Sequence, residues 1–202
     1  MNSETLLLLL ILLPFAGSAL AALLPANARN TEAWLSGCVT ITALAITICL
    51  YPSISEGEIL RYEIEWLPAA DLNFTLRMDG FAWMFSMLVT GIGFLVVLYA
   101  RYYMSPEDPV PRFFSFLLAF AGAMQGVVIA GNLILLAIFW ELTSIFSFLL
   151  IGYWHHNAAA RDGARMSLII TGTGGLCLLV GLILIGYITG SYDLDHVLAT
   201  GN

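Results

Sequence analysis

The sequence contains no lysine, and its seven arginines stand against fourteen acidic residues in 202 positions, for a formal net charge of −7. Charged residues make up 10% of the chain and hydrophobic residues 60%, whereas a soluble domain carries roughly 25% charged residues. This balance excludes an ordinary soluble domain, and the lack of a basic patch excludes the surface that nucleic-acid binding needs. We predict an integral membrane protein with no nucleic-acid partner.

Cysteine is also scarce, and its spacing excludes a disulfide framework or a zinc site. Cys38, Cys49 and Cys177 form neither a CxxC pair nor a Cys/His cluster, and each falls inside an apolar run. We expect thiols that pack among apolar side chains. The glycines of "TGTGGL" (Thr171 to Leu176) lack the GxGxxG spacing and the preceding strand of a nucleotide site. We therefore expect no cofactor and no metal.

What the chain has in quantity is long hydrophobic runs, each of about 19 residues or more and so long enough to cross a bilayer. The first run follows Glu4 rather than a positive segment, which favours an uncleaved span over a secretory signal. The predicted fold is an all-α membrane domain over residues 1–202. Its six predicted helices are Thr5–Leu24, Ala33–Tyr51, Gly80–Tyr103, Phe113–Ala130, Leu133–Tyr153 and Arg165–Gly190.

The long loop between the second and third spans, residues 52–79, has a different period. Apolar residues alternate with polar ones from Leu60 to Trp66, and the alternation resumes from Leu72 to Met78. A period of two on both sides of a short break is typical of a β-hairpin with one covered face. We predict an outer-side hairpin that caps the helices, in preference to a binding role.

The arginines predict the orientation, because positive residues favour the cytoplasmic side of a membrane. An N-terminus outside the cell places most of them on the inner side, and only two remain in the long outer loop. We therefore predict a multi-pass protein of the plasma (inner) membrane with its N-terminus outside. The inner arginines are Arg29, Arg101, Arg112, Arg161 and Arg165.

The fifth span carries one charge, Glu141, near its middle. It lies nine residues from Asn132, which is roughly 13 Å along a helix. An ionised side chain at that depth costs about 2.5–3.5 kcal/mol, unless the carboxyl binds a proton or meets a cation. We predict that Glu141 binds and releases a proton. A structural acid that hydrogen-bonds a neighbouring helix is the alternative.

Four other polar residues are weaker candidates for the same proton path. Ser144 lies one turn from Glu141 on the same helix face, and Gln125 lies on the preceding span. Either is also typical of a polar residue that packs between membrane helices. Asp79 starts the third span, where helix capping is the simpler role, and His155 lies at the inner surface. No cation among these 202 residues reaches the depth of Glu141.

Three segments carry a resemblance to a known family: "NLILLAIFWELTSIFSFLLIGYWHH", "RMDGFAWMFSMLVTGIGFLVVLYARYYM" and "RDGARMSLIITGTGGL". They resemble the N-terminal part of the A-type subunit of the Mrp-type multisubunit cation/proton antiporters, which is related to the antiporter-like chains of respiratory complex I. The resemblance implies that Glu141 matches the essential mid-membrane glutamate of the family. It also implies a lysine partner on a later helix, so the chain would be the N-terminal part of a longer protein.

The resemblance implies a transporter subunit rather than an enzyme, which exchanges Na⁺ for H⁺ in a complex with the other Mrp subunits. Two alternatives stay open. One is a proton-pumping chain of complex I or of a membrane-bound hydrogenase, where redox energy drives the same site. The other is a structural membrane anchor, in which Glu141 carries no proton.

Overall fold

The computed structural model describes residues 2–25, 28–67, 72–105 and 108–200. Within these ranges, six long helices are joined by two short ones and one β-hairpin. In chain order the elements are α1 (Ser3–Ala22), α2 (Arg29–Cys49), α3 (Tyr51–Ser55), β1 (Leu60–Leu67), β2 (Leu72–Met78), α4 (Gly80–Tyr103), α5 (Val110–Ile129), α6 (Leu133–Ile151), α7 (Ala158–Thr189) and α8 (Leu194–Thr200).

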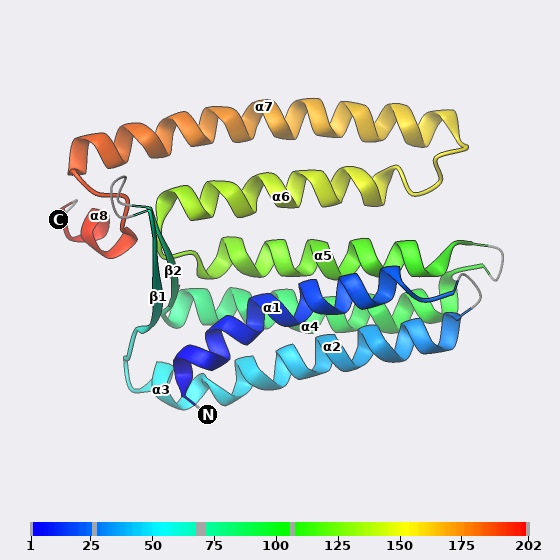
Figure 1. The fold of residues 1–202 in the computed structure, drawn as a ribbon, viewed down its shortest axis with the longest axis horizontal. Helices are drawn as coiled ribbons and strands as arrows, with labels where there is room; N and C mark the ends of the chain where they lie inside the picture. Colours follow the sequence, from blue (N-terminus) through cyan, green and yellow to red (C-terminus); the bar gives the residue numbers. More distant parts are fainter. Residues whose placement is uncertain (1, 26–27, 68–71, 106–107, 201–202) are drawn as a thin grey trace.

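The six long helices lie side by side along the longest axis of the molecule (Figure 1). Each is long and apolar enough to cross a membrane, which confirms the predicted six spans. The largest difference from prediction is the start of the last span, at Ala158 rather than Arg165. The side chain of Asn157 accepts a hydrogen bond from the backbone N–H of Ala159 at 2.9 Å and caps the helix there. The cap extends α7 through a polar stretch that hydropathy alone leaves outside the span.

Helices α1, α2, α4 and α5 form one bundle, which we call the N-terminal bundle. Leu7 and Leu10 of α1 and Phe114 and Leu118 of α5 are fully buried in it. Gly122 allows the close approach of α1 to α5, because a Cβ there would press against ring and proline atoms of α1. Helices α6 and α7 form a second layer that packs mainly on α5 (Figure 1), and α6 also touches β2 and, through Phe146, Phe15 of α1.

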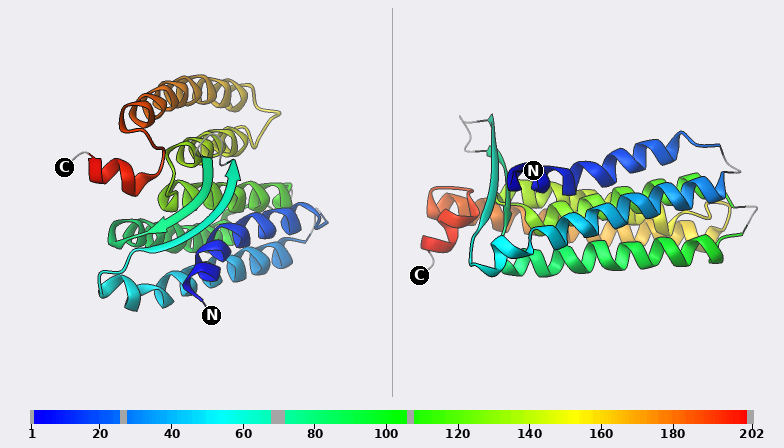
Figure 2. Two further views of the ribbon diagram at one scale, coloured as in Figure 1. Left: turned by 60° about the vertical axis from the view of Figure 1, so that its left-hand side comes forward. Right: turned by 90° about the horizontal axis from the view of Figure 1, so that it is seen from below.

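The β-hairpin lies across one end of the helices, nearly perpendicular to them (Figure 2). β1 and β2 pair antiparallel from Leu60 opposite Met78 to Leu67 opposite Leu72. Leu76 and Met78 are fully buried against the helix ends, whereas Trp66 near the far end of β1 is 59% exposed. The predicted hairpin between the second and third spans is confirmed. Of the predicted break at residues 67–70, Leu67 ends β1, and residues 68–70 lie outside the described residues.

The polar face of β2 is covered as well, although the alternation predicted only one covered face. Thr75 and Arg77 on that face are both buried. The segment between α5 and α6 covers them: the backbone N–H of Gly131 donates to the carbonyl of Thr75 at 2.8 Å. A Cβ at Gly131 would press against both side chains, so glycine is needed for this approach. The covering segment is remote in sequence, so the local pattern could not reveal it.

The three cysteines are free and exposed within the described chain. Cys38 lines an apolar groove with Ile41 and Phe94, so exposure does not separate it from apolar side chains. On a membrane helix the outward face is as apolar as the inward one, so an apolar neighbourhood in sequence does not mark a buried position.

Candidate functional site

Glu141 lies near the middle of α6, and its carboxylate is directed at α7. The backbone of Gly175 on α7 faces it so closely that a Cβ there would collide with the carboxylate oxygen Oε1. The missing side chain of Gly175 therefore makes the room in which the carboxylate lies. Within the described part of the chain, Oε1 is buried and has no hydrogen-bond partner. A buried, unsatisfied carboxylate oxygen is costly unless it binds a proton, a water molecule or a cation.

An open cavity of about 360 Å³ adjoins this position, between α5, α6 and α7. Trp140 and Gly174, the sequence neighbours of Glu141 and Gly175, both line it. Its remaining lining residues are Phe120, Met124, Thr143, Ser144, Ser147 and Thr171. Four of these carry hydroxyls, which keep acceptor lone pairs even when they donate to their own helix. The cavity can therefore hold water next to the turn of α6 that carries Glu141, although Glu141 itself does not line it.

Three of these hydroxyls donate to backbone carbonyls within α6 or α7, among them Ser144, which donates to the carbonyl of Trp140 at 3.5 Å. The hydroxyl of Thr143 donates to the carbonyl of Trp140 at 2.7 Å. The hydroxyl of Thr171 donates to the carbonyl of Ser167 at 2.8 Å. Ser144 is buried, and it is the weaker sequence candidate that the structure brings nearest to Glu141.

The other three candidates lie elsewhere. Gln125 is turned toward α4, where its Nε2 donates to the hydroxyl of Ser86 at 2.7 Å. His155 lies beyond the end of α6, with its Nδ1 3.3 Å from Nη1 of Arg112. Among the described residues, none of the three forms a hydrogen bond or an ion pair with Glu141.

Asp79 caps α4 at the hairpin end. Its carboxylate accepts from the backbone N–H of Ala82 at 2.9 Å and pairs with Arg77 at 2.7 Å. Burial raises the pKa of Asp79, but these hydrogen bonds and the positive charge of Arg77 outweigh burial, so the net pKa lies below its usual value. Asp79 therefore stays ionised, which suits a helix cap.

Sequence reasoning missed Gly175 and Thr171, although both lie in the "TGTGGL" segment. The glycine spacing of that segment argues against a nucleotide site but assigns these residues no other role. The signal that could have found them is different: small residues on a membrane helix mark the face where another helix approaches closely.

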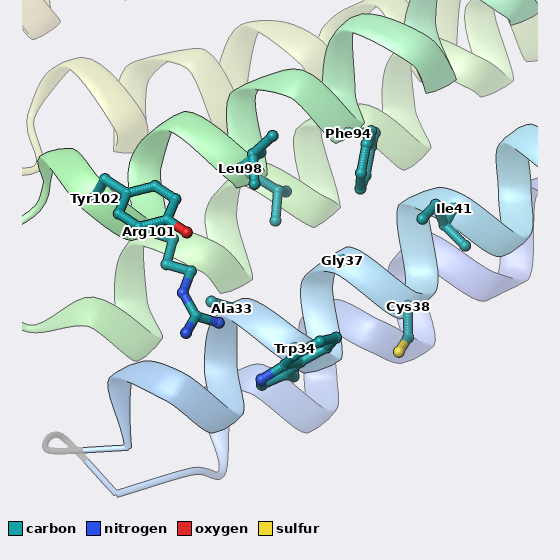
Figure 3. Close-up of a pocket in the computed structure, with 10 residues that line it drawn as sticks. Ala33, Trp34, Gly37, Cys38, Ile41, Phe94, Leu98, Arg101 and Tyr102 are labelled. Carbon is teal, nitrogen blue, oxygen red and sulfur yellow. The ribbon is translucent and has the colours of Figure 1, made fainter.

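The far side of the molecule holds an apolar groove of about 340 Å³ between α2 and α4, remote from α6 and α7 (Figures 1 and 3). Arg101 points into it beside Trp34 and Tyr102, with its guanidinium carbon 5.8 Å and 5.9 Å from the two ring centroids. Aromatic rings beside an arginine near a helix end are typical of a membrane–water interface. Because the groove lies between α2 and α4, it is separate from the Glu141 site between α6 and α7.

Two family models match the chain. The first, described as the N-terminus of chain 5 of NADH-ubiquinone oxidoreductase (complex I), covers residues 66–114. The second, described as the membrane region of NADH:quinone oxidoreductase and Mrp antiporters, covers residues 130–201 and so includes Glu141 and Gly175.

Two relatives are similar over most of this chain. A probable K⁺/H⁺ antiporter protein of Rhizobium meliloti (strain 1021), named as its A/B subunit, is 62% identical over 200 residues, which is 99% of this chain and 20% of that protein. The A1 subunit of a Na⁺/H⁺ antiporter of Staphylococcus aureus is 41% identical over 165 residues, 82% of this chain and 21% of that protein. The chain thus spans about a fifth of the length of these relatives.

Solved structures share the fold. A chain of the Mrp complex from Dietzia sp. DQ12-45-1b matches with a TM-score of 0.82 at 27% identity, over 95% of this chain and 20% of that one. A chain of complex I from Thermus thermophilus matches in fold, with a TM-score of 0.79 at 22% identity, over 96% of this chain and 39% of that one. The fold and the family matches thus define an antiporter-like membrane subunit. The chain belongs to the family of such subunits that Mrp antiporters and complex I share. Within that family it is similar to the N-terminal part of Mrp A-type subunits.

Proposed function

We propose that this chain works as the N-terminal part of a subunit of a monovalent cation/proton antiporter, in which Glu141 binds and releases the transported proton. The observation that carries the proposal is the buried Oε1 of Glu141, unpaired among the described residues and lying against the glycine of α7. Subunits named as Na⁺/H⁺ and K⁺/H⁺ antiporters among the relatives support the exchange of a monovalent cation. The chain acts as a transporter rather than an enzyme.

The chain's own residues supply three parts of this mechanism. α6 holds the carboxyl within the apolar layer and directs it at α7. Gly175 leaves the carboxyl space at the surface of α7. The hydroxyls of Ser144, Thr143 and Thr171 hold water that passes the proton toward the carboxyl and away from it.

The basic partner of Glu141 comes from the rest of the subunit. Large apolar side chains of α7 are exposed. Only 11% of the apolar 18-residue stretch of α7 is buried, against 50% of the corresponding stretch of α5. We propose that further helices of the longer subunit pack on these side chains and bring a lysine near the glutamate. The exposed side chains include Ile169, Ile170, Leu176, Val180, Leu184 and Ile188.

The positions of the arginines support the proposed orientation, and the Mrp relatives support the proposed partners. All five arginines of the shorter loops lie at the helix ends away from the hairpin, at residues 29, 101, 112, 161 and 165. By the positive-inside rule we propose that this end faces the cytoplasm and that the hairpin and N-terminus lie outside the plasma membrane. The partners are the other subunits of an Mrp-type complex, with Na⁺ the first cation to test.

The experiment is cation-dependent proton release from everted vesicles that contain the complete complex. Glu141→Gln removes the titratable proton at nearly constant volume and should abolish release with Na⁺ and with K⁺. Glu141→Asp keeps a carboxyl and should retain part of it. Glu58→Gln, the same change at an exposed position of the outer loop, is the matched control and should leave release unchanged. Normal exchange in the Glu141→Gln variant would contradict the proposal.

A complex I type chain is the second candidate, supported by the match of residues 66–114 to the complex I chain 5 model. It predicts proton movement driven by electron transfer and independent of a monovalent cation gradient. The same vesicles distinguish the two: an Mrp-type subunit responds to added Na⁺ or K⁺, and a complex I chain responds to NADH.

A further inference from the structure

A second carboxyl lies inside the molecule, in the first turn of α2. Glu32 is 0% exposed, and within the described ranges neither of its carboxylate oxygens has a hydrogen-bond partner. Arg29, one turn earlier, does not pair with it: its Nε and Nη2 donate to the backbone carbonyl of Arg101 at 3.0 Å and 2.5 Å. Hydropathy places Glu32 just ahead of the second span, so sequence reasoning assigns it no role.

Glu32 begins a polar stripe along the buried face of α2. Ser36, Thr40 and Thr47 follow it at helical spacing, and all three are buried. Thr40 and Thr47 donate to the carbonyls of Ser36 and Ala43 at 2.9 Å and 3.0 Å, which leaves their oxygens free to accept. The hydroxyl of Ser36 has no partner among the described residues. The stripe therefore offers a series of unused hydrogen-bonding positions.

Polar side chains of α4 and α5 meet this stripe at the centre of the N-terminal bundle. Gln125 donates to Ser86, while its buried Oε1 is unpartnered in the described part of the chain. Thr40, Thr90 and Gln125 line a small enclosed cavity between α1, α2, α4 and α5. Its volume of about 10 Å³ lies at the lower limit of what holds one water molecule, about 10–15 Å³. We call Glu32, Ser36, Thr40, Thr90, Gln125 and Ser86 the polar file.

Two arginines near this end of the bundle are engaged elsewhere, whereas the buried hydroxyl of Tyr153 has no partner among the described residues. Arg101 points into the outer groove beside Trp34 (Figure 3). Arg112 lies against His155 and the ring of Phe116. Burial raises the pKa of Tyr153 to about 12, so its hydroxyl stays neutral.

α1 brings no titratable side chain to this end, because its one charged residue, Glu4, lies at the opposite end of the helix. Within the described residues Glu32 thus has neither an ion-pair partner nor a hydrogen-bond partner, and a buried charge without a partner is costly.

We propose that Glu32 is a second proton-binding group, which holds a proton at rest and exchanges it with water along the polar file. In the exchange step the carboxyl O–H bond breaks, the proton passes to a water molecule in the file, and the carboxylate later takes a proton back. The file lies between α1, α2, α4 and α5, whereas Glu141 faces α7. It is therefore a separate proton position, and it goes beyond the function proposed for Glu141.

Infrared difference spectroscopy of the complete complex tests the first half of the proposal. A protonated carboxylic acid has a carbonyl-stretch band that an ionised carboxylate lacks. Glu32→Gln should remove one such band at neutral pH. The same band should persist in Glu141→Gln, so the Glu32 proposal can fail or hold independently of the function proposed for Glu141. Glu58→Gln, at an exposed position, should remove none. A spectrum unchanged by Glu32→Gln would overturn the proposal.

Variants that keep Glu32 test the second half and do not depend on how the Glu32→Gln protein folds. Ser36→Ala removes the hydroxyl one turn away and should shift the Glu32 band in frequency. Thr40→Val should slow the exchange of its proton for deuterium, because it removes the acceptor beside the small cavity. Thr173→Val, at an exposed position of α7, is the control. Exchange as fast in the Thr40→Val variant as in the parent would overturn the polar file.

Discussion

The N-terminal bundle and the α6–α7 pair are built in opposite ways around their carboxyls. Glu32 lies in a bundle closed on all sides, with neighbouring helices covering both of its oxygens. Glu141 lies at the seam of two helices, beside an open cavity lined by hydroxyls. Proton exchange at Glu32 therefore depends on the polar file. The α6–α7 pair instead leaves Glu141 where a group from another helix can approach it.

The helices around the two carboxyls also differ in how they approach one another. In the N-terminal bundle, Gly17 lies against Val39 and Gly122 against Phe15, both apolar side chains. At the α6–α7 seam Gly175 lies against a carboxylate. The first arrangement gains packing contacts, while the second makes room for a polar group. The same residue type therefore serves stability in one region and the candidate site in the other.

The largest expected effect is on the closed region. Glu32→Lys places an ammonium where the described residues offer no carboxylate partner, and we expect it to lower the free energy of unfolding by roughly 3 kcal/mol or to prevent assembly. Glu58→Lys, in the exposed outer loop, should change it by less than about 0.5 kcal/mol. Thermal unfolding of the two variants in detergent measures the difference. Equal melting temperatures would show that the bundle is not closed around Glu32.

The seam is tested by adding one methyl group. Gly175→Ala brings a Cβ into collision with the Glu141 carboxylate, and overpacking of this kind costs about 1–3 kcal/mol. We expect lower stability together with reduced cation-dependent proton release. Gly172→Ala is the matched control, because a Cβ there meets nothing within 4 Å and helix propensity favours alanine by about 0.5–1 kcal/mol. If both variants behave alike, the glutamate does not lie against Gly175.

A smaller effect separates Gln125 from the Glu141 site. Gln125→Leu removes the hydrogen bond to Ser86 and should cost about 1 kcal/mol of stability. A double-mutant cycle with Ser86→Ala should show coupling of about 0.5 kcal/mol or more, while a cycle with Glu141→Gln should be additive. Coupling of Gln125 to Glu141 instead would return Gln125 to the transport path.

The smallest effect concerns the hairpin end, where Arg61 binds Asp193 and Asp195, and Arg77 binds Asp195. Burial raises the pKa of Asp193, but the hydrogen bond from Arg61 and its positive charge outweigh burial, so the net pKa is lowered. A lowered pKa contributes stability above the ordinary value of about 3.9, and this stability is lost as pH falls through the lowered value.

Each of these partly exposed pairs is worth about 0.2–1 kcal/mol. We therefore expect α8 to loosen from the hairpin below about pH 4. Hydrogen exchange of the Leu194 amide, which donates to the carbonyl of Gly131 at 2.9 Å, measures it. The buried hairpin residue Leu76 is the control and should stay protected. Protection of Leu194 that does not change with pH would contradict the role of these ion pairs.

The fold was largely readable from the sequence because its signals are local. The length of each apolar run sets a span, as Gly80–Tyr103 shows with identical predicted and observed bounds. The period of two sets the hairpin, and the position of Glu141 within its run sets its depth. These properties depend on residues near one another in the chain, so no knowledge of the packing is needed.

What lies opposite each side chain was decided only by the tertiary structure. In a membrane helix every face is apolar, so the sequence does not state which face is buried, and the rotation of each helix follows from its neighbours. That rotation turned Gln125 toward Ser86, placed Gly175 against Glu141, exposed the cysteines and enclosed Glu32. Apolar run length and residue position were enough to predict the six spans and the depth of Glu141. Only the packing of the helices decided which acids are left without partners.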